Sequence, residues 1–286
     1  MTLQQLAYFL AVARTLNFTR AAAEARVAQP SLSKQIRVLE SELGSALFTR
    51  TPSVALTPAG AALVPIASRI LSDVDSARLE VAELAGLRRG RIRLGATPSL
   101  CVGVLPAVLR AFHDEHPGVR LRVQESGSGD LTAALVAGEL DLALVIVPPQ
   151  GVDPALRAIP VLRDELVVAS AEELPERMRV ADLRTRPMVM YREGYDLRET
   201  TLAACRSAGF EPALAVEGGE MDAVLRFVEA GLGVAVVPRL VLADRPRLRS
   251  AALAGMRRTV AIAHRSDAPP TSAARAFREL LLAHVG

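Results

Sequence analysis

The stretch Gln29-Pro30-Ser31-Leu32-Ser33-Lys34-Gln35-Ile36-Arg37 decides the fold of the first part of the chain. Its apolar residues recur at helical spacing up to Leu43, and Pro30 suits a first helical turn, where its missing N–H needs no partner. We expect a helix from Pro30 to Leu43, ended by Gly44. A second face of this helix carries an amide, hydroxyls and two cations, with no carboxylate before Glu40. Such a face suits the major groove of DNA, where Gln bridges adenine and cations reach guanine or phosphate.

The residues before this stretch predict two further helices. Leu3 to Ala13 carries apolar residues at helical spacing, and Thr19 is a good N-cap for a short second helix from Arg20 to Ala25. A tight connection at residues 27–29 then leads into the polar-faced helix. This order is that of a helix-turn-helix.

Two short strands are predicted after these helices, at residues 47–50 and 54–57, around Thr51-Pro52-Ser53. Such a hairpin forms a wing, and Arg50 at its base is placed to enter a minor groove or to bind a phosphate. A polar helix face by itself is usually only solvated. The DNA interpretation therefore depends on the complete order of short helix, tight turn, polar helix and basic wing.

The net charge of the chain is concentrated in the same region. The 286 residues carry 34 basic and 31 acidic side chains, and residues 1–58 alone hold six basic and three acidic ones, so the rest is neutral overall. All basic residues are Arg except Lys34, which lies in the polar-faced helix. This distribution indicates that nucleic acid is a partner of the first part of the chain.

Composition excludes several classes of protein. Half of the residues are apolar and 23% are charged, as in folded globular proteins. No apolar run approaches the roughly 18–20 residues of a membrane helix, and no basic stretch followed by an apolar core indicates a secretory signal. Two cysteines, Cys101 and Cys205, are too few for a disulfide framework. We expect a cytoplasmic protein that does not contact a membrane.

At this point the residues resemble a known family. The motifs Phe18-Thr19-Arg20-Ala21-Ala22, Gln29 to Ile36, Leu39-Glu40-x-Glu42-Leu43-Gly44-x-x-Leu47-Phe48-x-Arg50 and Leu56-Thr57-x-x-Gly60 are similar to the winged helix-turn-helix of the LysR-type transcriptional regulators. The resemblance implies that the residues facing DNA are Gln29, Pro30, Ser31, Ser33, Lys34 and Arg37, with Thr19 and Arg20 near phosphates and Arg50 in the wing. Ala28 departs from the family, which often has a capping Ser there, and the wing tip lacks an extra cation.

A long helix is predicted from Pro58, after the N-cap Thr57, to about Leu87. Apolar residues follow a heptad spacing along it: Leu63, Ala67, Ile70, Val74, Ala77, Val81 and Leu84. These residues form a seam along the helix. The helix either packs on its own domain or pairs two subunits, and the narrowness of the seam favours pairing. The resemblance also implies a dimerising helix here, followed by a hinge at residues 87–90.

From Arg91 onward, short apolar runs alternate with helices, which predicts a parallel or mixed sheet covered by helices. The expected strands are 91–96, 119–123, 140–147, 165–169, 188–191, 214–217, 233–237 and 259–264, and the expected helices are 99–113, 131–136, 197–208, 221–230 and 272–284. We expect the last helix to return to the first lobe. The resemblance implies a two-lobed module, like a periplasmic binding protein, that binds a small-molecule effector in its cleft.

Three turns after predicted strands are rich in small or polar residues: 97–99, 126–129 and 217–220. Ligands bind at such turns in open α/β sheets, and helix N-termini favour anions. The candidate cleft residues are Thr97, Ser99, Ser128, Val147, Tyr191, Glu193 and Glu217. The two glutamates oppose a carboxylate ligand, so an anionic effector is only one hypothesis.

Three other functions compete with an effector-controlled regulator. An enzyme is not expected, because dinucleotide, P-loop and nucleophile-elbow motifs are missing, and His113 and His116 are better explained as a helix end than as a metal site. A redox sensor would use Cys205, but Asp196 stands where the reactive cysteine of peroxide-sensing family members is expected. A DNA-binding protein without a ligand would not need nearly 200 further residues.

The sequence therefore predicts an α/β regulator in three parts. Residues 1–58 form the winged helix-turn-helix, residues 59–90 the linker helix and hinge, and residues 91–286 the effector-binding domain, with lobe I at 91–160 and 266–286 and lobe II at 161–265. The expected partners are promoter DNA, a second copy of the chain in a dimer or tetramer, RNA polymerase and a small metabolite, with no cofactor and no metal. Effector, operator, direction of regulation, oligomer size and thiol chemistry stay undecided.

Overall fold

A computed structural model describes residues 1–84 and 90–285 of the chain. The chain forms two compact units, which we describe separately: residues 1–88 with 134–139, and residues 89–133 with 140–286. The boundary at residue 133 falls inside the helix Ser128–Val136, which is described whole with the second unit. Among the described residues, no helix is long and apolar enough to cross a membrane.

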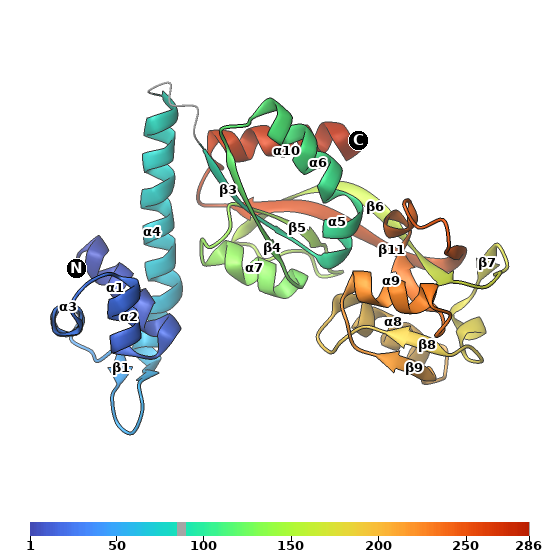
Figure 1. The fold of residues 1–286 in the computed structure, drawn as a ribbon, viewed down its shortest axis with the longest axis horizontal. Helices are drawn as coiled ribbons and strands as arrows, with labels where there is room; N and C mark the ends of the chain where they lie inside the picture. Colours follow the sequence, from blue (N-terminus) through green and yellow to red (C-terminus); the bar gives the residue numbers. More distant parts are fainter. Residues whose placement is uncertain (85–89, 286) are drawn as a thin grey trace. The chain divides into compact units, whose positions relative to one another are not determined.

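The first unit is mainly helical. It contains α1 (Leu3–Thr15), α2 (Phe18–Glu24), α3 (Gln29–Leu43), β1 (Phe48–Thr49), β2 (Ala55–Leu56) and α4 (Pro58–Leu84), as Figure 1 shows. Its core is built around Phe9, Leu32, Ile36, Leu39 and Phe48, all buried. The ring of Phe48 lies 5.5 Å from that of Phe9 and 5.7 Å from that of Phe18, so the wing is anchored to α1 and α2 by aromatic packing.

The second helix begins earlier than the sequence suggested. Asn17, not Thr19, caps α2: its side-chain oxygen accepts a hydrogen bond of 2.9 Å from the N–H of Arg20. Asn is as good a cap as Thr, and capping at residue 17 allows Phe18 to start the helix and face the core. The prediction that Thr19 is the cap is therefore wrong, and Thr19 lies exposed in the first turn of α2.

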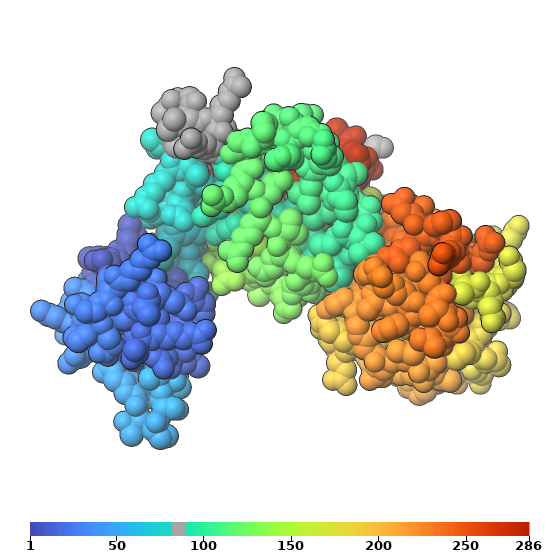
Figure 2. Space-filling model, viewed as in Figure 1, coloured from blue at the N-terminus to red at the C-terminus, as the bar shows by residue number. Residues whose placement is uncertain are grey.

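The predicted polar-faced helix is confirmed as α3. Ala28 is its N-cap and makes no side-chain cap bond, and Gly44 ends it with a φ of +66°, a conformation that favours glycine. The wing follows as an antiparallel pair that joins Phe48 to Leu56 and Thr49 to Ala55. Its tip, in light blue, projects from the helices of this unit in Figure 2.

Helix α4 starts where it was predicted, because the N–H of Gly60 donates to Oγ1 of Thr57 at 3.0 Å. The described helix ends at Leu84. The predicted continuation to Leu87 and most of the predicted hinge at residues 87–90 lie outside the described residues.

The second unit is built on one long sheet. Its elements are β3 (Arg91–Ala96), α5 (Pro98–Gly103), α6 (Leu105–Glu115), β4 (Arg120–Glu125), α7 (Ser128–Val136), β5 (Leu142–Ile146), β6 (Leu156–Ser170), β7 (Arg177–Met178), η1 (Val180–Leu183), β8 (Met188–Met190), α8 (Asp196–Ser207), β9 (Leu214–Glu217), α9 (Met221–Glu229), β10 (Ala235–Pro238), η2 (Arg239–Leu242), β11 (Arg249–Arg265) and α10 (Ser272–Val285). The strand order is β10-β6-β11-β5-β3-β4, with β7 paired to β11.

The sheet is mixed, as predicted. Strand β3 pairs in parallel with β4 and β5, whereas β11 pairs antiparallel with β5 and β6, and β6 pairs antiparallel with β10. Strands β8 and β9 form a separate parallel pair. Antiparallel pairing of β6 with β11 explains why these two strands are much longer than the predicted segments 165–169 and 259–264, because the same two strands continue through both halves of the unit.

Two hydrophobic cores divide this unit, and we call the parts around them lobe I and lobe II. The core of lobe I includes Ile92, Leu144 and Phe112, and the core of lobe II includes Met190, Leu225 and Val236. Helix α10 packs in lobe I, with the ring of Phe277 5.3 Å from that of Phe112, which confirms the predicted return of the last helix. Figure 1 shows β6 and β11 running from lobe I into lobe II.

The segment predicted as one helix at residues 99–113 is two helices. Helix α5 ends at Gly103, and α6 begins at Leu105 with Pro106 in its first turn. Pro106 lacks the N–H that would continue α5, so the break falls just before it. A Cβ at Gly103 would come within 2.0 Å of Cδ1 of Leu240, so this end of α5 packs closely on η2.

Candidate functional sites

Helix α3 presents two faces of opposite character. Its apolar stripe (Leu32, Ile36 and Leu39) is completely buried in the first unit. On the other side, Gln29, Pro30, Ser31, Lys34 and Arg37 are exposed, and Ser33 is half-buried. The structure therefore brings all six residues predicted on this helix to its outer side, where a groove of DNA can reach them.

Local contacts order part of this face. The amide of Gln29 donates to Oγ of Ser33 at 2.9 Å, and Nε of Arg37 donates to the carbonyl oxygen of Ser33 at 3.4 Å. Lys34 is exposed to solvent on the same surface. An amide and a guanidinium are thus oriented by one serine between them.

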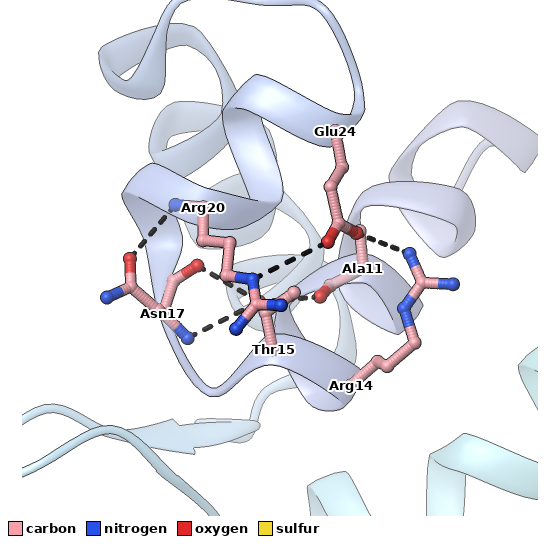
Figure 3. Close-up of polar contacts among 6 residues, drawn as sticks. All are labelled: Ala11, Arg14, Thr15, Asn17, Arg20 and Glu24. Carbon is pink, nitrogen blue, oxygen red and sulfur yellow. Dashed lines mark hydrogen bonds and ion pairs between the residues drawn. The ribbon is translucent and has the colours of Figure 1, made fainter.

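Arg20 stands at the edge of this region on α2. Figure 3 shows its backbone N–H on Asn17 and its guanidinium turned toward Glu24, at 3.8 Å, which also pairs with Arg14. The side chain of Arg20 is 74% exposed, and Glu24 is shared between two arginines. An exposed pair of this kind contributes little to stability, so Arg20 is free to exchange Glu24 for a phosphate at small cost.

Glu40 connects the wing to α3. Its Oε1 accepts hydrogen bonds from the backbone N–H groups of Leu47 at 2.9 Å and Phe48 at 3.3 Å, and its Oε2 pairs with Arg50 at 2.8 Å. The guanidinium of Arg50 also lies 5.6 Å from the centre of the Phe18 ring. Arg50 is therefore placed at the base of the wing, as expected, but it is held by Glu40 and stays only half-exposed. Sequence reasoning missed Glu40, although its place in the motif around Arg50 was visible.

The predicted seam of α4 divides into two parts. Leu63, Ala67 and Ile70 pack against the core of the first unit. Val74 is half-buried, Ala77 is exposed and Val81 is 67% exposed, while the side chain of Leu84 lies outside the described residues. Of the described side chains in this seam, those of Ala77 and Val81 are open to a partner.

The second unit contains a cavity of about 1030 Å³ at the end of β5, between the N-terminal turns of α5, α7 and α8. Four predicted cleft residues line it: Thr97, Ser99, Ser128 and Val147. Oγ of Ser99 accepts a hydrogen bond of 2.9 Å from Arg258, and Oγ of Ser128 accepts one of 3.1 Å from the N–H of Ile146. Oγ of Ser99 also lies 3.4 Å from Oγ1 of Thr97, a contact in which either hydroxyl can be the donor, whereas the hydroxyl of Ser128 acts as an acceptor within the protein.

Three predicted cleft residues do not line this cavity. Tyr191 is buried in lobe II, where its hydroxyl donates to the carbonyl oxygen of Val236 at 3.0 Å. Glu217 pairs with Arg198 at 3.2 Å, and Glu193 is exposed on the turn before α8. Tyr191 and Glu193 follow β8, but this connection enters the cavity further along the chain, at Tyr195 and Asp196, and Glu217 ends β9 outside the cavity wall.

Sequence reasoning missed much of the cavity wall, including Arg258, Tyr195 and Asp196. Arg258 is buried and pairs with Asp164 at 2.9 Å, and burial raises the pKa of Asp164 against the opposing effect of this arginine. Tyr195 stacks on Tyr191 with ring centres 4.5 Å apart, and burial raises its pKa, so it stays neutral. Asp196 begins α8. No local pattern marks Arg258, because it lies inside a strand.

The cysteines have the properties of structural thiols. Cys205 is completely buried, and burial raises its pKa. Burial and the neighbouring Glu125 raise the pKa of Cys101 to about 12. A thiolate is the reactive form of cysteine, so both side chains are poor nucleophiles at neutral pH. Within residues 1–84 and 90–285, no group of histidine, cysteine and carboxylate side chains is arranged to hold a metal ion.

Comparisons with known proteins agree on one family. The description “LysR substrate binding domain” matches residues 85–286, and “Bacterial regulatory helix-turn-helix protein, lysR family” matches residues 3–61. The chain is 33% identical over 277 residues to a probable hydrogen peroxide-inducible genes activator of Mycobacterium avium, covering 93% of this chain and 88% of that protein. It is 31% identical over 248 residues to the transcriptional dual regulator GltC of Bacillus subtilis strain 168, covering 85% and 83%.

Two solved structures share the whole fold. A full-length OxyR variant from Pseudomonas aeruginosa, with one cysteine replaced by aspartate, matches with a TM-score of 0.74 and 27% identity, over 100% of this chain and 94% of that chain. CbnR, titled a LysR family transcriptional regulator, matches with a TM-score of 0.72 and 23% identity, over 100% of both chains, which shows a common fold.

Proposed function

Because the chain belongs to the LysR family of bacterial transcriptional regulators, we propose that α3 reads the base sequence of an operator half-site and that the cavity of the second unit binds the controlling effector. The chain is a DNA-binding regulator with an effector-binding domain. The observation that carries the assignment of α3 is its exposed polar face over a fully buried apolar stripe.

We divide the chain as its sequence suggested: residues 1–58 bind DNA, residues 59–90 link and dimerise, and residues 91–286 bind the effector. The matched ranges, 3–61 and 85–286, support this division. Within the last part, the lobe limits at residues 160 and 265 fall inside β6 and at the end of β11. Both lobes therefore share these two strands.

On DNA, we assign different roles to different side chains. Gln29, Ser33, Lys34 and Arg37 read base edges, because they project amide, hydroxyl and cationic groups from α3. Pro30 and Ser31 allow close approach of the helix N-terminus. Thr19, Arg20 and Arg50 hold phosphates or the neighbouring minor groove.

The assignment predicts different losses for two variants. Gln29→Ala removes a base contact, so it should weaken binding to the operator by about tenfold or more while leaving random DNA unchanged. Arg20→Ala removes a phosphate contact, so both DNAs should lose affinity equally. Fluorescence anisotropy with operator and scrambled duplexes measures both affinities.

Arg110→Ala is the matched control, because Arg110 is an equally exposed arginine with a carboxylate four residues away, on α6 in the second unit. It should change neither affinity. Equal losses on operator and scrambled DNA for Gln29→Ala would show that Gln29 does not read bases.

Assembly and partners follow from the family. The exposed second part of the α4 seam supports a dimer that places two copies of α3 on a two-fold-related operator, and two such dimers would form a tetramer. The CbnR structure titled as a complex with target DNA supports promoter binding. We propose that the regulator acts in the cytoplasm through RNA polymerase and needs no cofactor besides its effector.

Peroxide sensing is the alternative that the names of relatives suggest. We do not propose it, because Cys205 is buried with a raised pKa and Asp196 occupies the start of α8. Mild peroxide should leave the number of free thiols unchanged, as counted with a thiol reagent in denaturant. Formation of a disulfide between Cys101 and Cys205 would revive this alternative. The named relatives are regulators, and we assign no enzymatic activity.

A further inference from the structure

The N-terminus of α7 is already occupied by a carboxylate of the protein. Oδ2 of Asp196, the first residue of α8, lies 3.3 Å from the backbone N of Ser128, the first residue of α7, although the two are 68 positions apart. Asp196 therefore stands between the N-termini of two helices, whose partial positive charges both attract a carboxylate. Asp130 adds a second carboxylate to the first turn of α7.

A helix N-terminus in an α/β cleft is the usual place for the anionic group of a ligand. Here two carboxylates compensate the charge of α7. A third one, brought by a ligand, would meet like charges and would have to displace Asp196. The helix N-terminus, which in the sequence suggested an anionic effector, is thus already occupied by a carboxylate of the chain itself.

The other charges around the cavity also disfavour an anionic ligand. Both lining arginines have acidic partners: Arg258 pairs with Asp164 at 2.9 Å, and Arg257 lies 3.6 Å from Glu165. Asp153 and Glu199, like Asp196, line the cavity without forming an ion pair among the described residues. Within the described part of the chain, the cavity wall therefore has carboxylates without an ion-pair partner, whereas both of its arginines have one.

Tyr195 provides an independent indication of a ligand. Its side chain is only 5% exposed, it belongs to the cavity wall, and its hydroxyl has no hydrogen-bond partner among the described residues. Buried hydroxyls are almost always satisfied, so an unpaired hydroxyl in the cavity wall points to a partner supplied by a bound molecule. The apolar side chains of Pro98, Val147 and Leu197 can cover a short hydrocarbon body.

We propose that this cleft takes a small organic molecule with a primary ammonium group, and that Asp196 is the residue that selects it over a carboxylate-bearing molecule. The inference rests on the proposed role of the cavity as effector site. An ammonium donates up to three hydrogen bonds, which suits Asp196, the Tyr195 oxygen and the serine and threonine hydroxyls around them.

The test uses compounds of one length with different end groups: 1,4-diaminobutane, 1,4-butanediol and succinate. Isothermal titration calorimetry on the full chain should give the diamine an affinity at least about tenfold higher than that of succinate. Asp196→Asn keeps the size of the side chain but removes its charge. This variant should lose the preference for the diamine, and succinate should bind to it more tightly than to the unchanged chain.

Two further variants separate selectivity from damage to the fold. Glu199→Gln changes an exposed carboxylate of the wall and should weaken the diamine without altering the melting temperature. Asp114→Asn, on α6 and paired with Arg110, should change nothing. The inference is overturned if succinate binds as tightly as the diamine, if no compound binds up to about 10 mM, where affinities are already very weak, or if Asp196→Asn leaves the preference intact.

DNA binding is measured on the same preparations. Intact operator binding together with failed selectivity removes only this inference. Loss of operator-specific binding by the unchanged chain would instead remove the proposed function.

Discussion

At the scale of single residues, Gly60 shows how closely the wing and α4 meet. A Cβ at this position would lie 2.1 Å from the carbonyl oxygen of Leu47, a backbone atom that cannot turn away. The same carbonyl accepts the N–H of Thr57 at 3.0 Å, so it is fixed by the start of α4. The glycine is therefore required by packing and not by a positive φ.

Gly60→Ala should lower the free energy of unfolding of the first unit by about 2 kcal/mol or more, because overpacking forces a backbone shift. Urea unfolding followed by circular dichroism measures the change. Gly129→Ala is the control: nothing lies within 4 Å of its Cβ position, and alanine in a helix should be neutral or slightly stabilising. Equal stability of both variants would contradict the close contact.

His264 should make stability depend on pH. Burial lowers its pKa below the ordinary 6.5, and its Nε2 has no hydrogen-bond partner among the described residues. Below pH 6.5 the unfolded chain therefore binds a proton that the folded chain refuses, so the free energy of unfolding falls as the pH falls. Above pH 6.5 this contribution is complete.

Replacing the ring tests that dependence. His264→Gln should flatten the change in melting temperature between about pH 5 and pH 7. His113→Gln, an exposed histidine on α6, should leave it as it is. An unchanged slope in the His264 variant would show that other groups cause the pH dependence.

At the scale of elements, the two halves of α4 have different surroundings. Its first half packs on the DNA-binding helices through Leu63, Ala67 and Ile70, while Val81 is an exposed apolar residue near its described end. A heptad pattern alone does not distinguish these two uses, because both require an apolar stripe of the same period.

Val81→Glu should therefore weaken self-association without lowering the melting temperature of a monomer. The charge would be buried against a partner helix in the dimer but solvated in the monomer. Sedimentation velocity across a concentration series measures the shift. Arg78→Glu changes the charge of a neighbouring exposed residue and is the control. A dimer as stable as before would exclude this part of α4 from the interface.

At the scale of the whole molecule, the charge distribution determines how the regulator meets DNA. The surplus of three positive charges lies within residues 1–58, and a dimer doubles it along one stretch of duplex. Cations that neutralise phosphates release counterions, so affinity falls steeply with salt.

Raising the salt from about 50 to 200 mM should reduce operator affinity by about 10³-fold to 10⁵-fold if six to ten phosphates are contacted by the dimer. Anisotropy titrations at several salt concentrations give the slope. Arg20→Ala should reduce that slope by about one phosphate for each subunit, whereas Arg110→Ala should preserve it. A slope near zero would be incompatible with the proposed phosphate contacts.

The sequence by itself predicted what local signals can specify. Helix α3, its Gly44 end, the wing, Thr57 before α4 and the α/β character of residues 91–286 depend on periodicity, caps and turns between close neighbours. The cap of α2 was misplaced by two residues because Asn17 and Thr19 offer the same chemistry. Four of the cleft residues could also be predicted from the sequence, since the ends of strands are predictable.

Only the tertiary structure decided how distant segments meet. The lengths of β6 and β11 depend on their pairing with each other, and the cavity wall depends on Asp196 reaching Ser128 from 68 positions away. The contacts of Glu40 with the wing and of Arg258 with Asp164 likewise join separate elements. A local pattern carries no information on such contacts, because the free energy that selects them comes from packing and electrostatics that exist only once the chain has folded.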